Sequence, residues 1–537
     1  MGVGQAIDLA GEDLRSVLAL LERYLPGTEA WAYGSRVKWT SRPQSDLDLV
    51  VFAMPEQRRR VGDLREAFEE SNLPFRVDLF VWDEVPVAFR EQIRAEHVVI
   101  ARVGTCSGWR EVAIGEIADI VGGGTPSTRN PKNFGGSIPW LTPRDLSGTH
   151  DRCIERGKRN LSRQGLDGSS AKLLPTGAVL LSTRAPIGYV ALAKNPIATN
   201  QGFRSLVARN GTLPEFLYYW LKLNTEELER HASGSTFREL SGSALKDIRL
   251  GLPPFPEQRA IAHVLGTLDD RIEVNRRMSA TLEQMARALF KSWFVDFDPV
   301  RAKMAGRDTG LPQEIADLFP DRMVDSELGK IPEGWEVGQV SDICQRIENG
   351  GTPKRAIAEY WNGDVKWFKT SELVDGPLLD SSEHITALGL EKSSCKLWPA
   401  GTVVVALYAS PTVGRLGILG VPAAANQACC ALIAKPDFGR LFLFYVLLFG
   451  RPHLQNIAVG SAQQDISPRI VRDHQLILPP AGIAREFDRL AKPIYLQRVM
   501  DISESRTLSA LRDTLLPKLI SGEIRVPYAE RVVESVT

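Results

Sequence analysis

Two stretches of the chain place apolar residues at every seventh position. The first holds Ile261, Leu268, Asn275, Leu282 and Leu289. The second holds Phe487, Ile494, Asp501, Leu508 and Leu515, each 226 residues after its counterpart, so a polar residue interrupts the same heptad in both. A seven-residue apolar period is typical of helices that pack along a narrow seam. The pattern predicts two helices of about 35 residues, each roughly 50 Å long.

Two arrangements of these helices fit the pattern. They can pack on each other as an antiparallel coiled coil that separates the preceding domains, or each can cover the core of its own domain. A domain of about 150 residues rarely needs so long and narrow a stripe, which favours the pair. Asn275 and Asp501 then either fix the register or lie solvated at the edge. The expected flanking residues are Val264, Met285, Leu490 and Leu511.

The chain before each predicted helix has the pattern of β structure. Residues 179–183 and 403–407 are β-rich runs bounded by proline and glycine, which predict strands in two mostly-β domains. Leu252-Pro253-Pro254 and Leu478-Pro479-Pro480 end these domains, because proline cannot continue a strand ladder.

The two halves of the body repeat each other. Gly124-Thr125-Pro126 recurs at 351–353, residues 138–146 are echoed at 365–373, and Leu174-Pro175 is matched by Trp398-Pro399. Asn200-Gln201 recurs at 426–427. These landmarks keep the same order, so the body is interpreted as a tandem duplication of about 190 residues per unit.

The repeat and the turn-rich stretch between its copies define the expected domains. The predicted boundaries are 1–104 for an N-terminal α/β domain, 105–255 and 335–480 for the two mostly-β domains, 256–298 and 481–521 for the long helices, 299–334 for the linker and 522–537 for the C-terminal tail. The fold class is therefore α+β and multidomain.

Composition and charge narrow the classes of protein only slightly. The 537 residues are 43% hydrophobic and 24% charged with zero formal net charge, which is ordinary for a globular protein. Residues 105–255 carry 19 basic and 13 acidic side chains, against 13 and 17 in residues 1–104, so the first half of the body is the more basic part.

Several site classes are not expected. The six cysteines form no C-x-x-C pair and no H-x-x-x-H spacing occurs, which argues against a zinc site or a disulfide framework. No apolar run is long enough for a membrane helix and no export signal is recognisable at the N-terminus, so a cytoplasmic protein is expected. No phosphate-binding loop is present, so no ATP-driven motor is expected.

Three carboxylates outside the repeat suggest a metal site. Asp46 and Asp48 fall two residues apart in a β-rich run and so share one face of a strand. Asp78 lies in a second β-rich run that can pair alongside. Carboxylate oxygens are the ligands that Mg²⁺ prefers, and Gly34-Ser35 begins a turn whose backbone can approach a phosphate. Such a triad fits metal-dependent nucleotidyl transfer. In the alternative, Asp46 and Asp48 have no function beyond keeping an edge strand soluble.

The stretch from about 28 to 102 resembles the minimal nucleotidyltransferase domain of the DNA polymerase β-like superfamily. The resemblance implies that Asp46, Asp48 and Asp78 bind metal and act in catalysis. It also implies that Gly34, Ser35 and Arg36 hold a nucleoside triphosphate. Trp39 departs from the family, which usually has a small residue there.

The body, from about 109 to 524, resembles the DNA-specificity subunit of type I restriction-modification systems. The resemblance is carried by Trp109, the turn at 123–126, Ile138-Pro139-Trp140, Asn200-Gln201, and the segments 252–258, 294–298, 331–335 and 516–524. The second copy departs from it at Pro480-Ala481-Gly482, where the first has Pro254-Phe255-Pro256.

This resemblance implies a binding protein without chemistry of its own. Each β-rich domain would read one half of a bipartite double-stranded DNA site. The paired helices would set the spacing and dock two methyltransferase subunits, and restriction and translocase subunits would join the complex. No cofactor is expected for this body.

Basic residues in both copies are candidates for DNA contact. Lysine and arginine on phosphates give affinity, and polar contacts to base edges give sequence specificity. The candidates are Arg129, Lys132, Arg144, Lys158, Arg159 and Arg184 in the first copy, and Lys354, Arg355, Lys366 and Lys369 in the second. For any one of them the alternative is an ordinary solvated charge.

Two other functions stay open at this point. The chain can be a Mg²⁺-dependent nucleotidyltransferase that uses the duplicated body to position its acceptor. Alternatively, the N-terminal domain can act as the partner of a toxin-like or regulatory chain.

Overall fold

The computed structural model describes most of the chain, which divides into two compact units. The described residues are 7–25, 28–42, 44–53, 57–101, 109–148, 151–184, 186–209, 211–234, 238–408, 412–459, 465–524, 526, 529 and 533. One unit comprises residues 1–270 and 509–537, and the other residues 271–508. Cys106 and much of the predicted tail at 522–537 lie outside the described residues.

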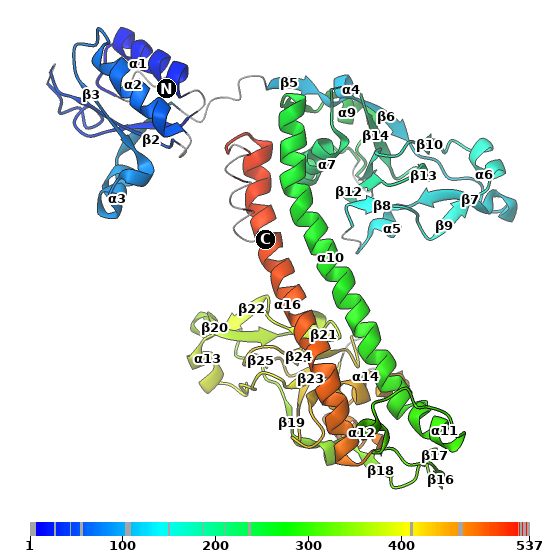
Figure 1. Cartoon of the computed structure of the whole chain (residues 1–537). Coiled ribbons are helices and arrows are strands. Elements are labelled where there is room, and N and C mark those ends of the chain that lie inside the picture. The colour runs from blue at the N-terminus through cyan, green and yellow to red at the C-terminus, as the bar shows by residue number, and fades with distance from the viewer. Residues whose placement is uncertain are drawn as a thin grey trace. The chain divides into compact units, whose positions relative to one another are not determined.

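The N-terminal domain is a four-stranded sheet in the order β3-β2-β1-β4 (Figure 1). Its strands are β1 (Ala30–Tyr33), β2 (Leu47–Val51), β3 (Val77–Val81) and β4 (His97–Ala101). Strands β2 and β3 are parallel, and β1 is antiparallel to both β2 and β4. Helices α1 (Gly11–Tyr24) and α2 (Arg58–Glu69) bury Val17 and Leu64 with Leu49 in one core.

The second face of this sheet has its own small core. Because side chains alternate along a strand, Asp48 and Val50 point away from the face of Leu49. Val50 packs there with Tyr33 and with Trp82 and Ile93, which come from η3 (Trp82–Glu84) and α3 (Val87–Ala95). Asp48 therefore lies on the face that α1 and α2 leave open.

The first β-rich domain contains a five-stranded sheet, β6-β14-β11-β12-β8, a four-stranded sheet, β10-β13-β7-β9, and the pair β5-β15. The strands are β5 (Arg110–Ala113), β6 (Ala118–Gly122), β7 (Phe134–Leu141), β8 (Cys153–Ile154), β9 (Arg159–Leu161), β10 (Leu173–Leu174), β11 (Val179–Thr183), β12 (Ile187–Ala193), β13 (Ile197–Thr199), β14 (Arg204–Ala208) and β15 (Arg249–Leu252). Its helices are α4 (Ile114–Ile117), η4 (Pro131–Asn133), α5 (Pro143–Leu146), α6 (Arg163–Asp167), α7 (Pro214–Leu223), α8 (Thr225–Arg230) and α9 (Gly242–Asp247).

The second β-rich domain repeats this plan with the sheets β19-β26-β23-β24-β21 and β22-β20-β25 and the pair β18-β27. The strands are β18 (Glu336–Gln339), β19 (Cys344–Asn349), β20 (Trp361–Phe368), β21 (Gly376–Leu378), β22 (Glu383–Ile385), β23 (Val403–Ala406), β24 (Leu416–Leu419), β25 (Ala423–Ala425), β26 (Cys429–Ala434) and β27 (Gln475–Leu478). Its helices are η5 (Val340–Ile343), η6 (Ala358–Tyr360), η7 (Thr370–Glu372), α13 (Ala387–Glu391), α14 (Arg440–Val459) and α15 (Pro468–Arg472).

Two long helices follow the β-rich domains. They are α10 (Phe255–Phe294) and α16 (Ala481–Ile520), each of 40 residues, and each begins directly after a Pro-Pro pair. The predicted α+β order of elements is thus confirmed. None of the helices in the described ranges is both long and apolar enough to cross a membrane.

The two long helices run antiparallel within each unit. In the unit of 271–508, Phe290 stacks edge-on against Phe487, and Arg271 pairs with Glu504 at 2.8 Å. In the other unit, Asp269 pairs with Arg512 at 2.8 Å. Positions later in α10 thus meet positions earlier in α16, as an antiparallel pair requires.

The apolar seam follows the predicted heptad only in part. Ile261, Leu268, Phe487, Leu508 and Leu515 are buried. Beyond Asn275 the stripe of α10 drifts to Ala286, Phe290 and Trp293, because an unsupercoiled helix has 3.6 rather than 3.5 residues per turn. Met285, expected to flank the seam, is 54% exposed, so that expectation was wrong.

The polar interruption is buried rather than solvated. Asn275 and Asp501 are 4% and 5% exposed. The Asn275 amide donates to Glu504 at 2.9 Å, and Asp501 accepts from Gln497 at 2.7 Å. The second carboxylate oxygen of Asp501 is buried with no hydrogen-bond partner in the described part of the chain. Asn275 therefore bonds across to α16, whereas Asp501 bonds a residue of its own helix.

The segment between the two copies is packed rather than loose. It contains α11 (Asp298–Met304), α12 (Gln313–Ala316) and the hairpin β16 (Met323–Ser326) with β17 (Gly329–Pro332). Ile315, Phe319 and Ile331 are buried in one core with Trp293 and Trp335. The Pro- and Gly-rich composition therefore marks tight turns between short elements that belong to the second unit's core.

Candidate functional site

The carboxylates of the N-terminal domain meet at the edge between β2 and β3. Asp48 and Asp78 are direct neighbours in the parallel register of these strands. Asp46 precedes β2 and is exposed. Gly34 follows β1 with a φ of +80°, and a Cβ on it would lie 2.2 Å from Oδ2 of Asp48. Only glycine can stand there, so the chain at Gly34 lies directly against the Asp48 carboxylate.

Asp48 is the carboxyl at this edge whose pKa is shifted. Burial, then the charges of Asp78 and Asp46, raise the pKa of Asp48. Burial, then the charges of Asp48 and Asp78, raise the pKa of Tyr33, which faces Asp48 from β1, to about 12. Within the described ranges no three His, Cys, Asp or Glu side chains converge closely enough to form a ready-made metal site. The edge is negatively charged, so a bound cation would reduce the repulsion among the carboxylates. Asp46, Asp48 and Asp78 would have to move closer together to coordinate a single ion.

Asp48→Asn is expected to stabilise strand β2 at neutral pH. A carboxyl with a raised pKa binds its proton more tightly in the folded state, so its contribution to stability is present at low pH and is lost as pH rises through the folded pKa. The amide of the Asp48→Asn variant cannot ionise, so the variant does not lose this stability as the pH rises. Amide hydrogen exchange of β2 in the full chain should be slower in the variant at pH 7 and converge with wild type near pH 3. Faster exchange at pH 7 would contradict it.

Arg36 braces the turn after Gly34. Its side chain is 5% exposed, and it donates to the carbonyls of Asp8 at 2.9 Å and Ser45 at 3.0 Å. The guanidinium lies 4.2 Å from the ring of Phe75. The Arg36 side chain thus holds two backbone segments together, and its contact with a nucleotide stays a prediction. Ser35 remains half-buried beside Gly34.

Trp39 in the same turn has an unusual backbone. Its φ is +57°, which is the left-handed region, and the side chain is 59% exposed. A residue other than glycine rarely adopts this conformation without strain. The usual small residue of the resembled family is therefore replaced here by an exposed indole on a strained turn.

The repeated landmarks of the body form the same interlocked core in both copies. The ring nitrogen of Trp140 donates to the carbonyl of Gly124 at 3.1 Å, and that of Trp367 donates to Gly351 at 2.9 Å. A Cβ on Gly124 would lie 2.2 Å from the backbone of Ala171, and one on Gly351 meets Ser394 at 2.5 Å. Their close approach requires glycine. These landmarks thus hold the two sheets together.

The basic candidates of the first copy are mostly open to solvent. Arg129, Lys132, Arg144 and Lys158 are exposed, and none of them pairs with a carboxylate among the described residues. Arg159 lies on β9 with its guanidinium 3.9 Å from the ring centre of Phe134. Arg184 is the exception, because Glu239 lies 3.8 Å away.

The basic candidates of the second copy are largely paired. Glu383 accepts from Arg355 and, at 2.8 Å, from Lys369, and these contacts lower its pKa. Lys366 pairs with Asp380, whose pKa falls to about 2 chiefly because of that bond. Lys354 is exposed. Sequence reasoning named the cations but missed their acidic partners, which are Asp380 in the loop before β22 and Glu383 on β22.

An arginine lies against an equivalent aromatic ring in both copies, but it comes from a strand in the first copy and from a turn in the second. Phe134 and Trp361 begin the equivalent strands β7 and β20. Arg355, which covers Trp361 at 3.9 Å, precedes η6, whereas Arg159 comes from β9. Glu383 occupies the register position of Arg159, since Trp367 and Trp140 face them. The charge at this strand position is thus reversed between the copies.

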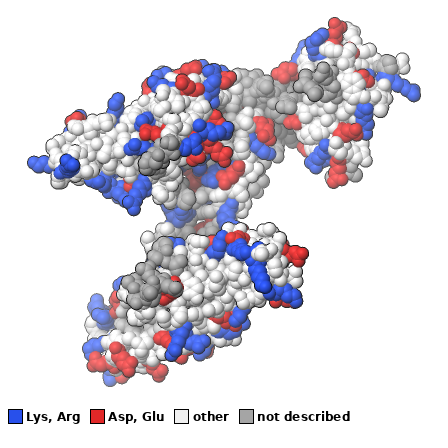
Figure 2. Space-filling view, turned by 180° about the vertical axis from the view of Figure 1, so that it is seen from behind, with Lys and Arg blue, Asp and Glu red and all other residues white. Residues whose placement is uncertain are grey.

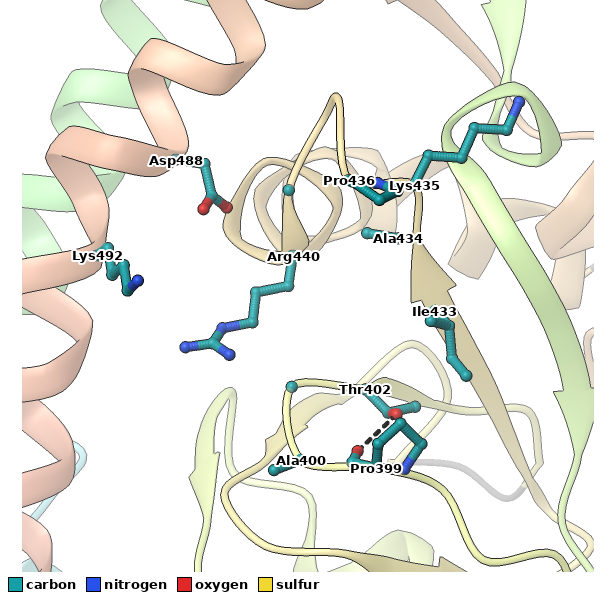
Figure 3. Close-up of a pocket in the computed structure, with 12 residues that line it drawn as sticks. Pro399, Ala400, Thr402, Ile433, Ala434, Lys435, Pro436, Arg440, Asp488 and Lys492 are labelled. Atoms are coloured by element: carbon teal, nitrogen blue, oxygen red, sulfur yellow. Dashed lines mark hydrogen bonds between the residues drawn. The ribbon is translucent and has the colours of Figure 1, made fainter.

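The face of the molecule in Figure 2 shows basic and acidic side chains interspersed. A polar cavity of about 370 Å³ lies in the second unit (Figure 3). Arg440 and Lys492 line it from opposite sides, and their side chains point toward each other. Asp488 in its wall accepts from the backbone N–H of Leu441 at 2.8 Å and so caps the start of α14. This cap occupies the end of the helix that an anion would otherwise bind.

Comparisons with known proteins match the body and the N-terminal domain separately. Residues 106–284 and 332–492 match the family described as type I restriction modification DNA specificity domain. Residues 19–103 match the family described as polymerase beta nucleotidyltransferase.

Three similar proteins illustrate these matches. The type I restriction enzyme MjaIX specificity subunit of Methanocaldococcus jannaschii is 32% identical over 445 residues, covering 82% of this chain and 98% of that protein. The crystal structure of the type I restriction-modification system S subunit from M. genitalium has a TM-score of 0.51 at 15% identity, over 77% of this chain and 96% of that one. The probable protein adenylyltransferase MntA of Haemophilus influenzae is 42% identical over 95 residues, covering 18% of this chain and 83% of that protein.

Proposed function

Because the chain belongs to the type I restriction-modification DNA specificity family, with a nucleotidyltransferase-like domain at its N-terminus, we propose that its two β-rich domains each read one half of a bipartite DNA site. The observation that carries the proposal is the repeated plan of the two domains, each with a five-stranded sheet and each followed by a 40-residue helix. Two copies of one reading unit on an antiparallel pair fit two separate half-sites.

The two recognition domains, 109–252 and 335–480, would read different sequences. The exposed cations of the first supply phosphate contacts, and Arg159, held flat on Phe134, is suited to the paired acceptors of a guanine. In the second, Glu383 at the matching strand position can accept from a cytosine amino group only if Arg355 and Lys369 release it. The reversed charge thus favours two unlike half-sites.

Methylation and cleavage would come from partner chains. The family resemblance assigns two methyltransferase subunits to the helix pair, with restriction and translocase subunits joining the complex. The exposed sides of α10 and α16, including Met278 and Met500, are available for such contacts. No cofactor is proposed for the body.

The test is a genome-wide map of adenine methylation in cells that express the partner methyltransferase. Deleting the gene should remove one bipartite motif. Restoring it as Arg159→Ala should relax one base of one half-site, with a discrimination loss of roughly ten- to a hundredfold, because a bidentate base contact contributes about 1–3 kcal/mol. The other half-site should be unchanged. A map that does not respond to the deletion would contradict the proposal.

The N-terminal domain supports a second function, nucleotidyl transfer to a protein. Its carboxylate edge and its 42% identity to a probable protein adenylyltransferase favour ATP as donor and a protein hydroxyl as acceptor. Mg²⁺ held by Asp46, Asp48 and Asp78 would neutralise the charge on the triphosphate. Gly34 and Ser35 would lie along the phosphates, and Arg36 would keep their turn in place. In the alternative, the body serves only to position that acceptor. It would be supported if the protein transferred a nucleotide but directed no methylation to any DNA motif.

A further inference from the structure

Each recognition domain anchors a buried tyrosine on the long helix α10. Tyr219 in α7 and Tyr445 in α14 stand 226 residues apart and are counterparts in the repeat. They are 0% and 2% exposed. The hydroxyl of Tyr219 donates to Asp269 at 2.8 Å, and that of Tyr445 donates to Glu283 at 3.3 Å. One tyrosine of each domain thus bonds a carboxylate outside that domain's sheets.

An arginine of α16 completes each contact from the second helix. Arg512 donates to Asp269 at 2.8 Å, and Arg498 donates to Glu283. All four of these charged side chains are between 10% and 17% exposed. Each tyrosine–carboxylate–arginine network therefore joins three elements, which are one helix of the recognition domain, α10 and α16. Each network lies inside one of the two compact units.

In both copies an arginine also fills the space between the recognition domain and the long helix. It is Arg152 of the domain in the first copy and Arg498 of α16, already part of the network, in the second. In the first, Arg152 precedes β8 and donates to Asp270 at 2.7 Å and to the Tyr219 hydroxyl at 3.4 Å. It crosses Gly266 of α10, where a Cβ would lie 2.4 Å from its guanidinium. In the second, Arg498 reaches from α16 to Gly376 of β21, where a Cβ would lie 3.1 Å away.

The strand register shows that these arginines fill the same place. Cys153 pairs with Leu192, and Pro377 pairs with Ile418, the counterpart of Leu192. Arg152 and Gly376, each one residue earlier, are therefore counterparts. The domain supplies the arginine in one copy and the helix supplies it in the other. Both copies keep the contact although its source has changed.

Such networks restrict the angle of a domain more than apolar packing does. Hydrogen bonds weaken steeply when their geometry is distorted, and a buried charge that loses its partner is strongly destabilised. Burial, followed by the nearby carboxylate, raises the pKa of both tyrosines, so their hydroxyls stay protonated as donors. The apolar residues around them can repack with less directional preference.

We propose that Tyr219 and Tyr445 are positioning residues that hold each recognition domain at a fixed angle on the helix pair, and that they thereby make the protein discriminate the number of base pairs between its half-sites. This rests on the proposed DNA-reading function. One base pair changes the separation by about 3.4 Å and the phase by about 35°. If the two domains share this change equally, each needs about 17° and about 1.7 Å of play to accept a neighbouring spacing.

The test measures methylation by the full chain with its methyltransferase subunits. The substrates carry the native half-sites with the native spacer, one base pair fewer and one more. The variants are Tyr219→Phe, Tyr445→Phe and the double variant. The matched control is Tyr218→Phe, since Tyr218 is similarly buried but its hydroxyl accepts, among the described residues, only from Lys222 in the same helix, at 3.4 Å. A milder second variant, Arg152→Lys, addresses the first network from the other side.

We expect the rate on the native spacer to change less than about threefold. The ratio of native to altered spacer should fall about tenfold in each tyrosine variant and further in the double, since each loses a hydrogen bond to a charged group. Tyr218→Phe should keep the wild-type ratio. A ratio that stays at the wild-type value in the tyrosine variants, whether or not their overall rate falls, overturns the positioning role alone. Absence of any bipartite methylation by the wild-type complex overturns the proposed function, and the inference with it.

Discussion

Asp48→Ala is expected to lower nucleotidyl transfer by the N-terminal domain at least about a hundred- to a thousandfold. Asp48 is the central carboxylate of the edge, with Asp78 beside it in the strand register and Gly34 against its oxygen. Its loss removes the negative charge nearest to the proposed cation site. The measurement is transfer of label from ATP in the presence of Mg²⁺ to protein, with the full chain and its partner subunits.

The raised pKa of Asp48 makes it possible to distinguish a loss of catalysis in Asp48→Ala from a loss of folding. Burial, then repulsion by Asp78 and Asp46, raises the pKa of Asp48, so removing the carboxylate removes a charge that the folded state disfavours. An inactive variant with unchanged or slower amide exchange in β2 therefore reports on chemistry. Asp63→Ala is the control, because Asp63 is exposed on α2, against the opposite face of the sheet. Full transfer by Asp48→Ala, or equal loss in Asp63→Ala, would refute the assigned role.

Leu268→Asp and Leu508→Asp are each expected to abolish methylation by the assembled complex. Both leucines are fully buried, and an unpaired carboxylate at either place costs about 3–5 kcal/mol in addition to the lost apolar packing. This is a large fraction of the stability of a typical domain. Co-purification with the methyltransferase subunit and the rate of methylation should fall together.

Two exposed methionines on the same helices provide matched controls. Met278 in α10 is 48% exposed and Met500 in α16 is 63% exposed. Met278→Asp and Met500→Asp add the same charge without burying it, so the fold should tolerate them. A loss of methyltransferase binding in either, with the melting temperature retained, would mark a docking surface instead. Normal methylation by Leu268→Asp would show that the helix pair is not needed.

The sequence predicted the architecture well because its signals were repeated. Each landmark of the first copy has a counterpart about 226 residues later, and glycines such as Gly124 and Gly351 are required by the same backbone approach. The parallel pairing of Asp48 with Asp78 likewise follows from two β-rich runs, of which the first carries Asp46 and Asp48 and the second carries Asp78. Both kinds of signal depend on local chemistry that the sequence displays directly.

Other features depended on contacts between distant segments and could not be predicted. The contacts of Arg36 with the carbonyls of Asp8 and Ser45 could not be read from its place after Gly-Ser, and its predicted contact with a nucleotide stays a prediction. Met285 fitted a strict heptad, whereas the stripe drifts away from it. The acidic partners of Lys366 and Lys369 lie 14 residues away on a loop and a strand that only the sheet register brings near. The individual DNA contacts remain predictions.

The arginine beside the long helix comes from the domain in the first copy (Arg152) and from α16 in the second (Arg498). This difference limits which recognition domains can be exchanged between the two positions. A first recognition domain grafted onto the second helix would bring Arg152 to the crevice that Arg498 already fills, and two guanidiniums would compete for one carboxylate. The reciprocal graft would bring Gly376 to a crevice with neither. We therefore expect chimeric subunits to need each domain transferred together with the residues of its own crevice.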